Sequence, residues 1–121
     1  MRAIPYAEYA NVPTLFCIAD SNGNEIYRSD PINFWHTHIC VSPDCKLLGG
    51  EGTHDHMYVH AALFDQRCTT IDFVPLATVH SEYHSFSAAA VNAFFLADSR
   101  TLVYSDTIDG KQQVCAVEVD I

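Results

Sequence analysis

The chain has 121 residues, of which 49% are hydrophobic and 17% charged, a composition that argues against disorder and suits one globular domain over residues 1–121. Fifteen acidic and six basic residues give a formal net charge of -9, and the basic residues stand singly. Nucleic-acid binding is therefore not expected, because it depends on clustered Lys and Arg. A polyanionic substrate would be repelled unless a bound cation bridged it to the protein.

The five cysteines are odd in number and show no C-x-x-C spacing, so the sequence predicts neither a disulfide framework nor a thiolate zinc site. We expect buried thiols in a reducing compartment. The N-terminal residues lack the apolar segment of a signal peptide, and no apolar run approaches the ~20 residues of a membrane helix. The sequence thus predicts an acidic, cytoplasmic protein without membrane contact.

The chain begins with a segment of ambiguous structure, which a β-hairpin follows. Residues 1–12 fit either one face of a short helix or an irregular segment. Residues 15–19 and 25–28 flank a polar turn whose Asn22-Gly23 pair favours positive φ. They predict a β-hairpin.

Four consecutive antiparallel strands are expected next, at residues 34–41, 46–50, 57–64 and 69–74. Ser42-Pro43-Asp44-Cys45 is typical of a type I turn between the first two strands. The glycines at positions 49, 50 and 52 should loosen the backbone before the third strand.

Residues 79–97 fit two structures equally well, a short helix near residues 85–93 or a strand. Residues 101–105 and 113–119 then predict a second antiparallel unit around an Asp109-Gly110 turn. The two units form a weak internal repeat. Repeats of ~40–45 residues, each a small antiparallel sheet, are typical of β-propeller blades.

Several short motifs follow one another from about residue 14 to the C-terminus. They are His38-Ile39-Cys40-Val41-Ser42-Pro43-Asp44, Leu47-Leu48-Gly49-Gly50-Glu51-Gly52-Thr53, Tyr58-Val59 with Phe64-Asp65, Ser105-Asp106-Thr107-Ile108-Asp109-Gly110-Lys111, and Val114-Cys115-Ala116-Val117-Glu118-Val119. In their order and spacing the chain resembles the C-terminal blades of the oligogalacturonate lyases, seven-bladed β-propellers of polysaccharide lyase family twenty-two.

The resemblance implies a partial β-propeller of about two blades and a manganese-dependent β-elimination on short oligogalacturonides. In this reaction the metal binds the uronate carboxylate and acidifies the neighbouring C–H bond, from which a base removes the proton. The resemblance assigns His38 as a metal ligand, since its position before Asp44 matches the family's. The family's Gln and H-P-H ligands fall at residues 90–93, where this chain has no histidine, and no residue is assigned as the base.

The histidines form two candidate sets of metal ligands. His36 and His38 are two residues apart on an expected strand, so both should point to one face. His80 and His84 stay together on either a strand or a helix. If such ligands converge they could bind a divalent metal, manganese by the resemblance, so the predicted ligands are His38, His36, His80 and His84. The competing interpretation is that His36 and His38 are half-buried, hydrogen-bonded strand residues and that His80 and His84 belong to a solvated polar loop.

Two functions remain open from the sequence. The first is a lyase-like, divalent-metal-binding β-protein that acts on a small-molecule or oligosaccharide ligand and is incomplete as an enzyme on its own. About two blades cannot close a ring, and exposed strand edges pair readily, so a homo-oligomer is expected. The second is a non-catalytic, homo-oligomeric all-β module that has lost the active site. Acid–base chemistry through Glu51, Asp55 or Glu82 beside a histidine is a further alternative.

Overall fold

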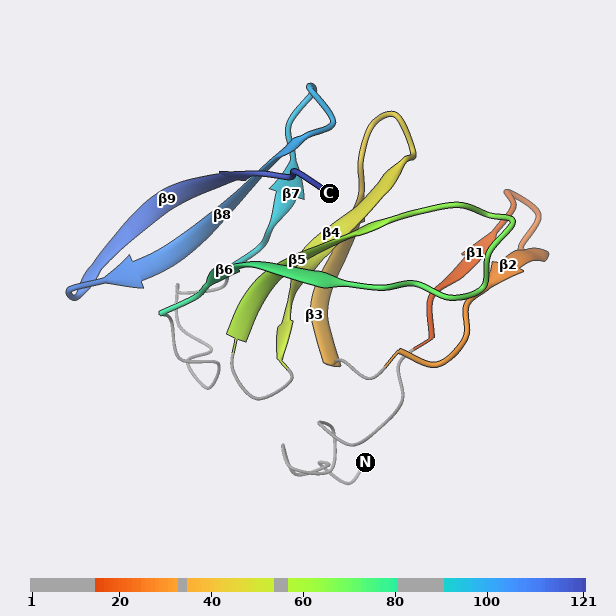
Figure 1. Ribbon diagram of the computed structural model, residues 1–121, viewed down its shortest axis with the longest axis horizontal. Helices are drawn as coiled ribbons and strands as arrows, with labels where there is room; N and C mark the ends of the chain where they lie inside the picture. The colour runs from red at the N-terminus through yellow and green to blue at the C-terminus, as the bar shows by residue number, and fades with distance from the viewer. Residues whose placement is uncertain (1–14, 33–34, 54–56, 81–90) are drawn as a thin grey trace.

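Nine β-strands in three antiparallel sheets make up the computed structural model, which describes residues 15–32, 35–53, 57–80 and 91–121. Within these segments there is no helix. The prediction of an all-β chain with antiparallel, blade-like sheets, one of them four-stranded, is confirmed. Figure 1 shows the four-stranded sheet between the other two.

The first sheet is the predicted hairpin of β1 (Cys17–Ala19) and β2 (Glu25–Arg28). The carboxylate of Asp20 accepts the backbone N–H groups of Asn22 and Asn24 at 2.9 Å each, which stabilises the turn. Gly23 has a φ of 83°, in the left-handed region that glycine adopts without strain.

The second sheet contains β3 (Trp35–Val41), β4 (Leu47–Thr53), β5 (Met57–Leu63) and β6 (Val74–Thr78), in that spatial order. The predicted turn between β3 and β4 is confirmed, because the N–H of Cys45 donates to the carbonyl of Ser42 at 2.8 Å. The Ser42 hydroxyl accepts the N–H of Leu47 at 2.9 Å and donates to Asp44 at 2.6 Å.

The expectation that the glycines after residue 48 form a loose connection is wrong, because β4 runs through them to Thr53. Two of these glycines allow neighbouring residues to approach β4 closely. A Cβ atom at Gly49 would lie 2.9 Å from the Phe95 ring, which belongs to the third sheet. Gly50 has a φ of 154°, and a Cβ atom added there would clash with the carbonyl oxygen of His38.

The predicted strand at 69–74 is also wrong, since β6 begins only at Val74. Residues 68–73 are instead tied to the first sheet. The Tyr27 hydroxyl donates to the carbonyl oxygen of Cys68 at 2.8 Å, and the N–H of Asp30 donates to the carbonyl oxygen of Thr69, also at 2.8 Å. Ile71 and Phe73 are buried against that sheet.

The third sheet consists of β7 (Phe94–Phe95), β8 (Thr101–Ile108) and β9 (Lys111–Glu118), with β8 in the middle. The predicted hairpin turn is confirmed, because Asp109 and Gly110 have φ values of 52° and 74°. The hairpin strands are longer than predicted. The structure does not describe residues 81–90, which include most of the candidate helix near 85–93. Residues 91–93 are not helical.

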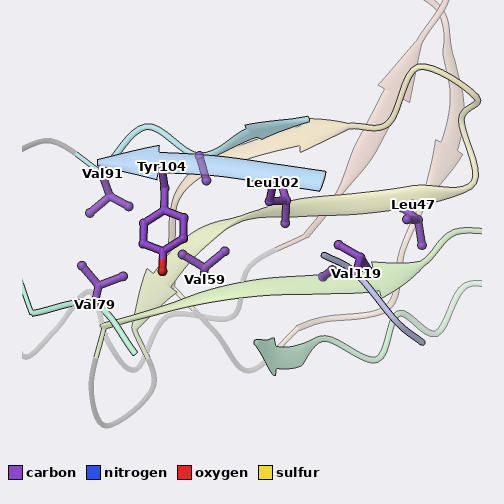
Figure 2. Close-up of a cluster of buried hydrophobic side chains, with 9 residues drawn as sticks. Leu47, Val59, Val79, Val91, Leu102, Tyr104 and Val119 are labelled. Atoms are coloured by element: carbon purple, nitrogen blue, oxygen red, sulfur yellow. The ribbon is translucent and has the colours of Figure 1, made fainter. Parts of the chain in front are cut away.

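Two apolar cores hold the three sheets together, one on each face of the four-stranded sheet. The core toward the β1–β2 hairpin contains Tyr27, Ile32, Leu48, Ala62, Ile71 and Phe73. The core toward β7–β9 contains Leu47, Val59, Ala61, Val79, Val91, Ala93, Leu102, Tyr104 and Val119. Figure 2 shows the ring of Tyr104 between Val91, Val79 and Val59. None of the described segments forms an apolar helix with the length that a lipid bilayer would require.

Candidate functional site

Two histidine–carboxylate pairs lie where the four-stranded sheet meets the β7–β9 sheet. In each pair the carboxylate is almost completely buried and the imidazole is about half exposed. Burying a carboxylate is costly unless hydrogen bonds satisfy it, so each acidic residue needs the partners that the fold supplies.

The first pair joins His38 of β3 to Glu51 of β4, which are cross-strand neighbours. Nδ1 of His38 donates to one carboxylate oxygen of Glu51, and the N–H of Ala93 donates to the other at 2.9 Å. The Glu51 side chain is 1% exposed and that of His38 47%. With its proton on Nδ1, the imidazole keeps a lone pair on Nε2 that can bind a metal or accept a proton.

The second pair joins His80, which follows β6, to Asp106 of β8. Nδ1 of His80 donates to Oδ2 of Asp106 at 2.8 Å, and the backbone N–H of His80 donates to the same carboxylate at 2.9 and 3.1 Å. Oδ1 also accepts the N–H of Thr107 at 2.8 Å. The side chains of Asp106 and His80 are 2% and 61% exposed.

The two carboxylates connect the sheets in opposite directions. Glu51 belongs to the four-stranded sheet and accepts an N–H from Ala93, just before β7. Asp106 belongs to the third sheet and accepts from His80, just after β6. The bonds that orient each imidazole therefore also fix one sheet against the other.

The two pairs lie at different levels along the four-stranded sheet. Glu51 is paired with Val59, which is paired with Ala77, so His38 lies in the row that includes Ala77 of β6. His80 follows three residues later in the chain, beyond the end of β6. Strands β4 and β5 separate β3 from β6, so the two imidazoles start from strands that are not neighbours.

The structure describes the side chains of only two of the four predicted metal ligands, His38 and His80. The β3–β4 register shifts between His36 and His38, which interrupts the alternation on which their common face was predicted. The side chain of His36 and the whole of His84 lie outside the described part of the structure. Metal ligation by these residues stays a prediction. Among the described residues, no group of three or more His, Cys, Asp or Glu side chains is arranged to hold a metal ion.

His60, the histidine of β5, has a structural role. His60 is fully buried on the opposite face of the sheet, where its Nε2 lies 3.2 Å from the carbonyl oxygen of Gly52. Its ring packs at a tilt against Tyr58 and edge-on against Phe73. It serves the core toward the β1–β2 hairpin.

The cysteines give no sign of an activated nucleophile. Burial raises the pKa of the Cys40 thiol to about 11, so this group is protonated at neutral pH. All five cysteines are free. The expectation that they are buried is wrong for Cys17, Cys45 and Cys68, which are exposed in turns or at the edge of the β1–β2 hairpin.

An open cleft of about 880 Å³ lies away from both pairs, beside the β1–β2 hairpin. It is lined by Ile18, Val41, Cys45, Phe64, Asp65, Gln66 and Arg67. Its walls are mainly apolar, and the Asp65–Arg67 ion pair forms its polar part.

Asp106 is the functional candidate that the sequence interpretation missed, and a signal for it was present. Leu102, Tyr104 and Asp106 occupy alternate positions of β8 that all face the core. An acidic residue on the apolar face of a strand needs a buried partner. Glu51 was considered beside a histidine, and His38 is that histidine.

Comparison with known proteins gives no relative, since no family model, curated protein or solved structure matches this chain.

Proposed function

We propose that this protein is a divalent-metal-binding, lyase-like β-protein and that His38 anchors its metal. The observation that carries the proposal is the His38–Glu51 pair, in which a buried carboxylate accepts the Nδ1 proton of a half-exposed imidazole. Histidines that bind metals are commonly oriented in this way through their other ring nitrogen. The position of His38 in motifs that resemble oligogalacturonate lyases supports manganese as the ion.

An imidazole nitrogen can bind a divalent ion, and His38 supplies one of the three or four ligands required. His36, His80 and His84 remain the predicted additional ligands, with a second subunit as the other source. Within this chain His38 would bind the ion, and Glu51 would orient the imidazole. The N–H of Ala93 in turn fixes the second oxygen of Glu51.

A bound divalent cation would hold the carboxylate of a uronate and acidify the neighbouring C–H bond. The charge of the protein also favours a cation. With a formal net charge of -9 the chain repels a polyanionic sugar at long range, and a bound cation offsets that repulsion locally.

Thermal unfolding with and without manganese tests the proposal. A saturating ion should raise the melting temperature, because ligand at 100 times its Kd adds about 2.7 kcal/mol to the free energy of unfolding. We expect His38→Ala to abolish the response and Glu51→Gln to weaken binding about 10- to 100-fold. Asp65→Asn, at an exposed carboxylate beside the β1–β2 hairpin and away from both pairs, is the control and should keep the response. A wild-type protein that ignores manganese, or a His38→Ala variant that responds fully, contradicts the proposal.

A non-catalytic, homo-oligomeric module is a second candidate, favoured by the outer face of the third sheet. Val114 of β9 is 79% exposed, and Phe94 of β7 is exposed on the same face. Strand β9 is also an edge strand, whose unpaired backbone groups can bind another chain. Sedimentation should show an oligomer that Val114→Lys dissociates, whereas Ile26→Lys in the first hairpin should not. A monomer at every concentration would exclude this candidate.

A further inference from the structure

We propose that two copies of this chain join through strand β9, whose outer edge pairs with the same edge of the second copy in an antiparallel ladder centred on Cys115. The ladder rests on the second candidate function, the homo-oligomeric module, and makes its interface a strand edge rather than a sheet face. It does not depend on metal binding. It is carried by the direction of the backbone groups of β9 and by the composition of this strand.

The third sheet has one strand fewer than the sheet that it packs against. The four-stranded sheet has the order β3-β4-β5-β6, and the third sheet has the order β7-β8-β9. Strand β7 contacts β3 and β4, and Figure 1 shows β9 at the rim of the molecule, with β8 between it and β7. Among the described strands, none pairs with the outer side of β9. A further strand would therefore extend the third sheet beside β9.

Alternate residues of β9 direct their backbone groups toward this outer edge. The N–H of Val119 donates to the carbonyl oxygen of Arg100 of the turn before β8 at 2.7 Å, and the β8–β9 register continues from there without a shift. In an antiparallel ladder every second residue bonds to the same neighbour. The odd-numbered residues of β9 therefore bond to β8, whereas Val114, Ala116 and Glu118 direct their N–H and C=O groups away from it.

Strand β9 lacks the features that keep an edge strand from pairing. Its eight residues include no proline, and its ladder with β8 has no bulge. The charged side chains, Lys111 and Glu118, lie at its two ends, and Val114 between them is 79% exposed. The edge strands of the four-stranded sheet, β3 and β6, both have register shifts, and β6 also contains Pro75. Because bulges, prolines and charges protect edges, β9 is the edge best suited to pairing.

A second copy of β9 fits this edge because the strand is complementary to itself. In an antiparallel pair with a two-fold axis at Cys115, residues 112–118 of one copy lie opposite residues 118–112 of the other. Val114 is then opposite Ala116 of the second copy, on both sides of the axis, and their outward backbone groups form hydrogen bonds. Lys111 of each copy lies at the Glu118 end of the other, whereas a parallel pair in register would set like charges side by side.

The same register makes Cys115 a reporter of the interface. Its backbone groups bond to β8, so the two Cys115 residues would form a non-hydrogen-bonded pair, with Cα atoms about 4.5 Å apart. This lies within the range of about 4.4–6.8 Å over which disulfides form. Air with copper phenanthroline, which takes two electrons and two protons from the thiols, should therefore link the dimer through Cys115. A dimer that is linked through another cysteine, or not linked, overturns the ladder.

Hydrogen exchange measured by NMR, with sedimentation of the same samples, tests the inference directly. Each copy has a net charge of -9, so the samples contain about 0.15 M salt, where charges more than about 8 Å apart are screened. As the dimer forms with rising concentration, the amides of Val114, Ala116 and Glu118 should become protected together. The amides of residues 113, 115 and 117 should be protected at every concentration, because they bond to β8.

Two outcomes contradict the ladder in different ways. A dimer in which the outward amides of β9 exchange as fast as in the monomer would associate through another surface, which overturns the inference alone. A chain that stays monomeric at every concentration overturns the inference together with the homo-oligomeric candidate. The manganese titration decides the metal-binding proposal in either case.

Ala116→Pro removes an outward N–H and leaves the ladder with β8 intact. It should raise the dissociation constant of the dimer at least about 10-fold and abolish the Cys115 link, since two hydrogen bonds are lost per dimer. Ala97→Pro is the matched control. Ala97 is the second residue of a turn that the N–H of Ser99 closes on the carbonyl of Leu96, a position that favours proline, so the dimer should persist.

Val114→Cys in a Cys115→Ser background tests the register, and its exposed position keeps the test valid if Ala116→Pro does not fold. In a ladder centred on Cys115 the two new thiols lie on a diagonal, about 7–8 Å apart between Cα atoms. They should link at least about 10-fold more slowly than the wild-type pair. Equally fast linking would centre the ladder on residue 114 and overturn the proposed register.

Discussion

The Asp65–Arg67 pair shows how an exposed ion pair makes stability depend on pH. Two hydrogen bonds from the Arg67 guanidinium, at 2.9 and 3.0 Å, lower the pKa of the Asp65 carboxyl from its ordinary value of 3.8 to about 2. A lowered pKa stabilises the folded protein above pH 3.8, and this contribution is lost as the pH falls toward 2. Because both side chains are substantially exposed, the effect on stability should be small.

A carboxyl NMR titration should therefore find the midpoint of Asp65 near pH 2, and Arg67→Gln should return it toward the ordinary value. Arg28→Gln removes the comparable pair with Glu25 and is the control that should leave Asp65 unchanged. An Asp65 midpoint near 4 in the wild type would contradict the ion-pair geometry.

The residues of the candidate site differ in how far the sequence could predict them. Asp106 interrupts the apolar alternation of Leu102 and Tyr104, so its burial could be inferred from the pattern of β8, whereas Glu51 follows glycines and lies beyond the predicted end of its strand at residue 50. The pairing of His38 with Glu51 could also be inferred once β3 and β4 were joined by a short turn. The pairing of His80 with Asp106 could not, because it joins two sheets whose packing no local pattern encodes.

Strand β4 shows why glycine is not always a loop residue. Gly49 lies under the third sheet, where an added Cβ would be 2.9 Å from the Phe95 ring and 3.0 Å from Leu102. We expect Gly49→Ala to lower the free energy of unfolding by about 1–3 kcal/mol, since the neighbouring side chains must shift. Urea unfolding would measure the change.

Gly110 provides the comparison, because its φ is 74° and nothing lies within 4 Å of an added Cβ. Asparagine adopts such a φ readily, so Gly110→Asn should cost only a few tenths of a kcal/mol to about 1 kcal/mol. If Gly49→Ala proved as stable as Gly110→Asn, the close approach of β4 to the third sheet would be wrong.

The boundaries of β4 and β6 also show where local patterns fail. The 69–74 segment has strand-forming residues, but its start is bound to the first hairpin, because Tyr27 donates to the carbonyl of Cys68 and Asp30 to that of Thr69. Pro75 is then accommodated in β6, which is an edge strand with one side free of ladder bonds. Hairpins closed by short turns were predictable, whereas these long-range hydrogen bonds were not.

The three sheets depend on each other, since the four-stranded sheet buries both of its faces. Leu102 is central to the core toward β7–β9 and has no exposed surface. Its removal leaves a cavity between two sheets that Glu51 and Asp106 also connect, so the surroundings cannot collapse freely to fill it. We expect Leu102→Ala to lower the free energy of unfolding by about 2–5 kcal/mol.

Leu63→Ala is the matched control, because this leucine is also on a strand but is 64% exposed. Its loss should change the free energy of unfolding by no more than about 0.5 kcal/mol. Urea unfolding followed by both tyrosine fluorescence and circular dichroism would show whether the sheets separate together. A single transition that Leu102→Ala shifts as a unit supports mutual dependence, whereas an early transition confined to one probe would show that the third sheet detaches before the other two unfold.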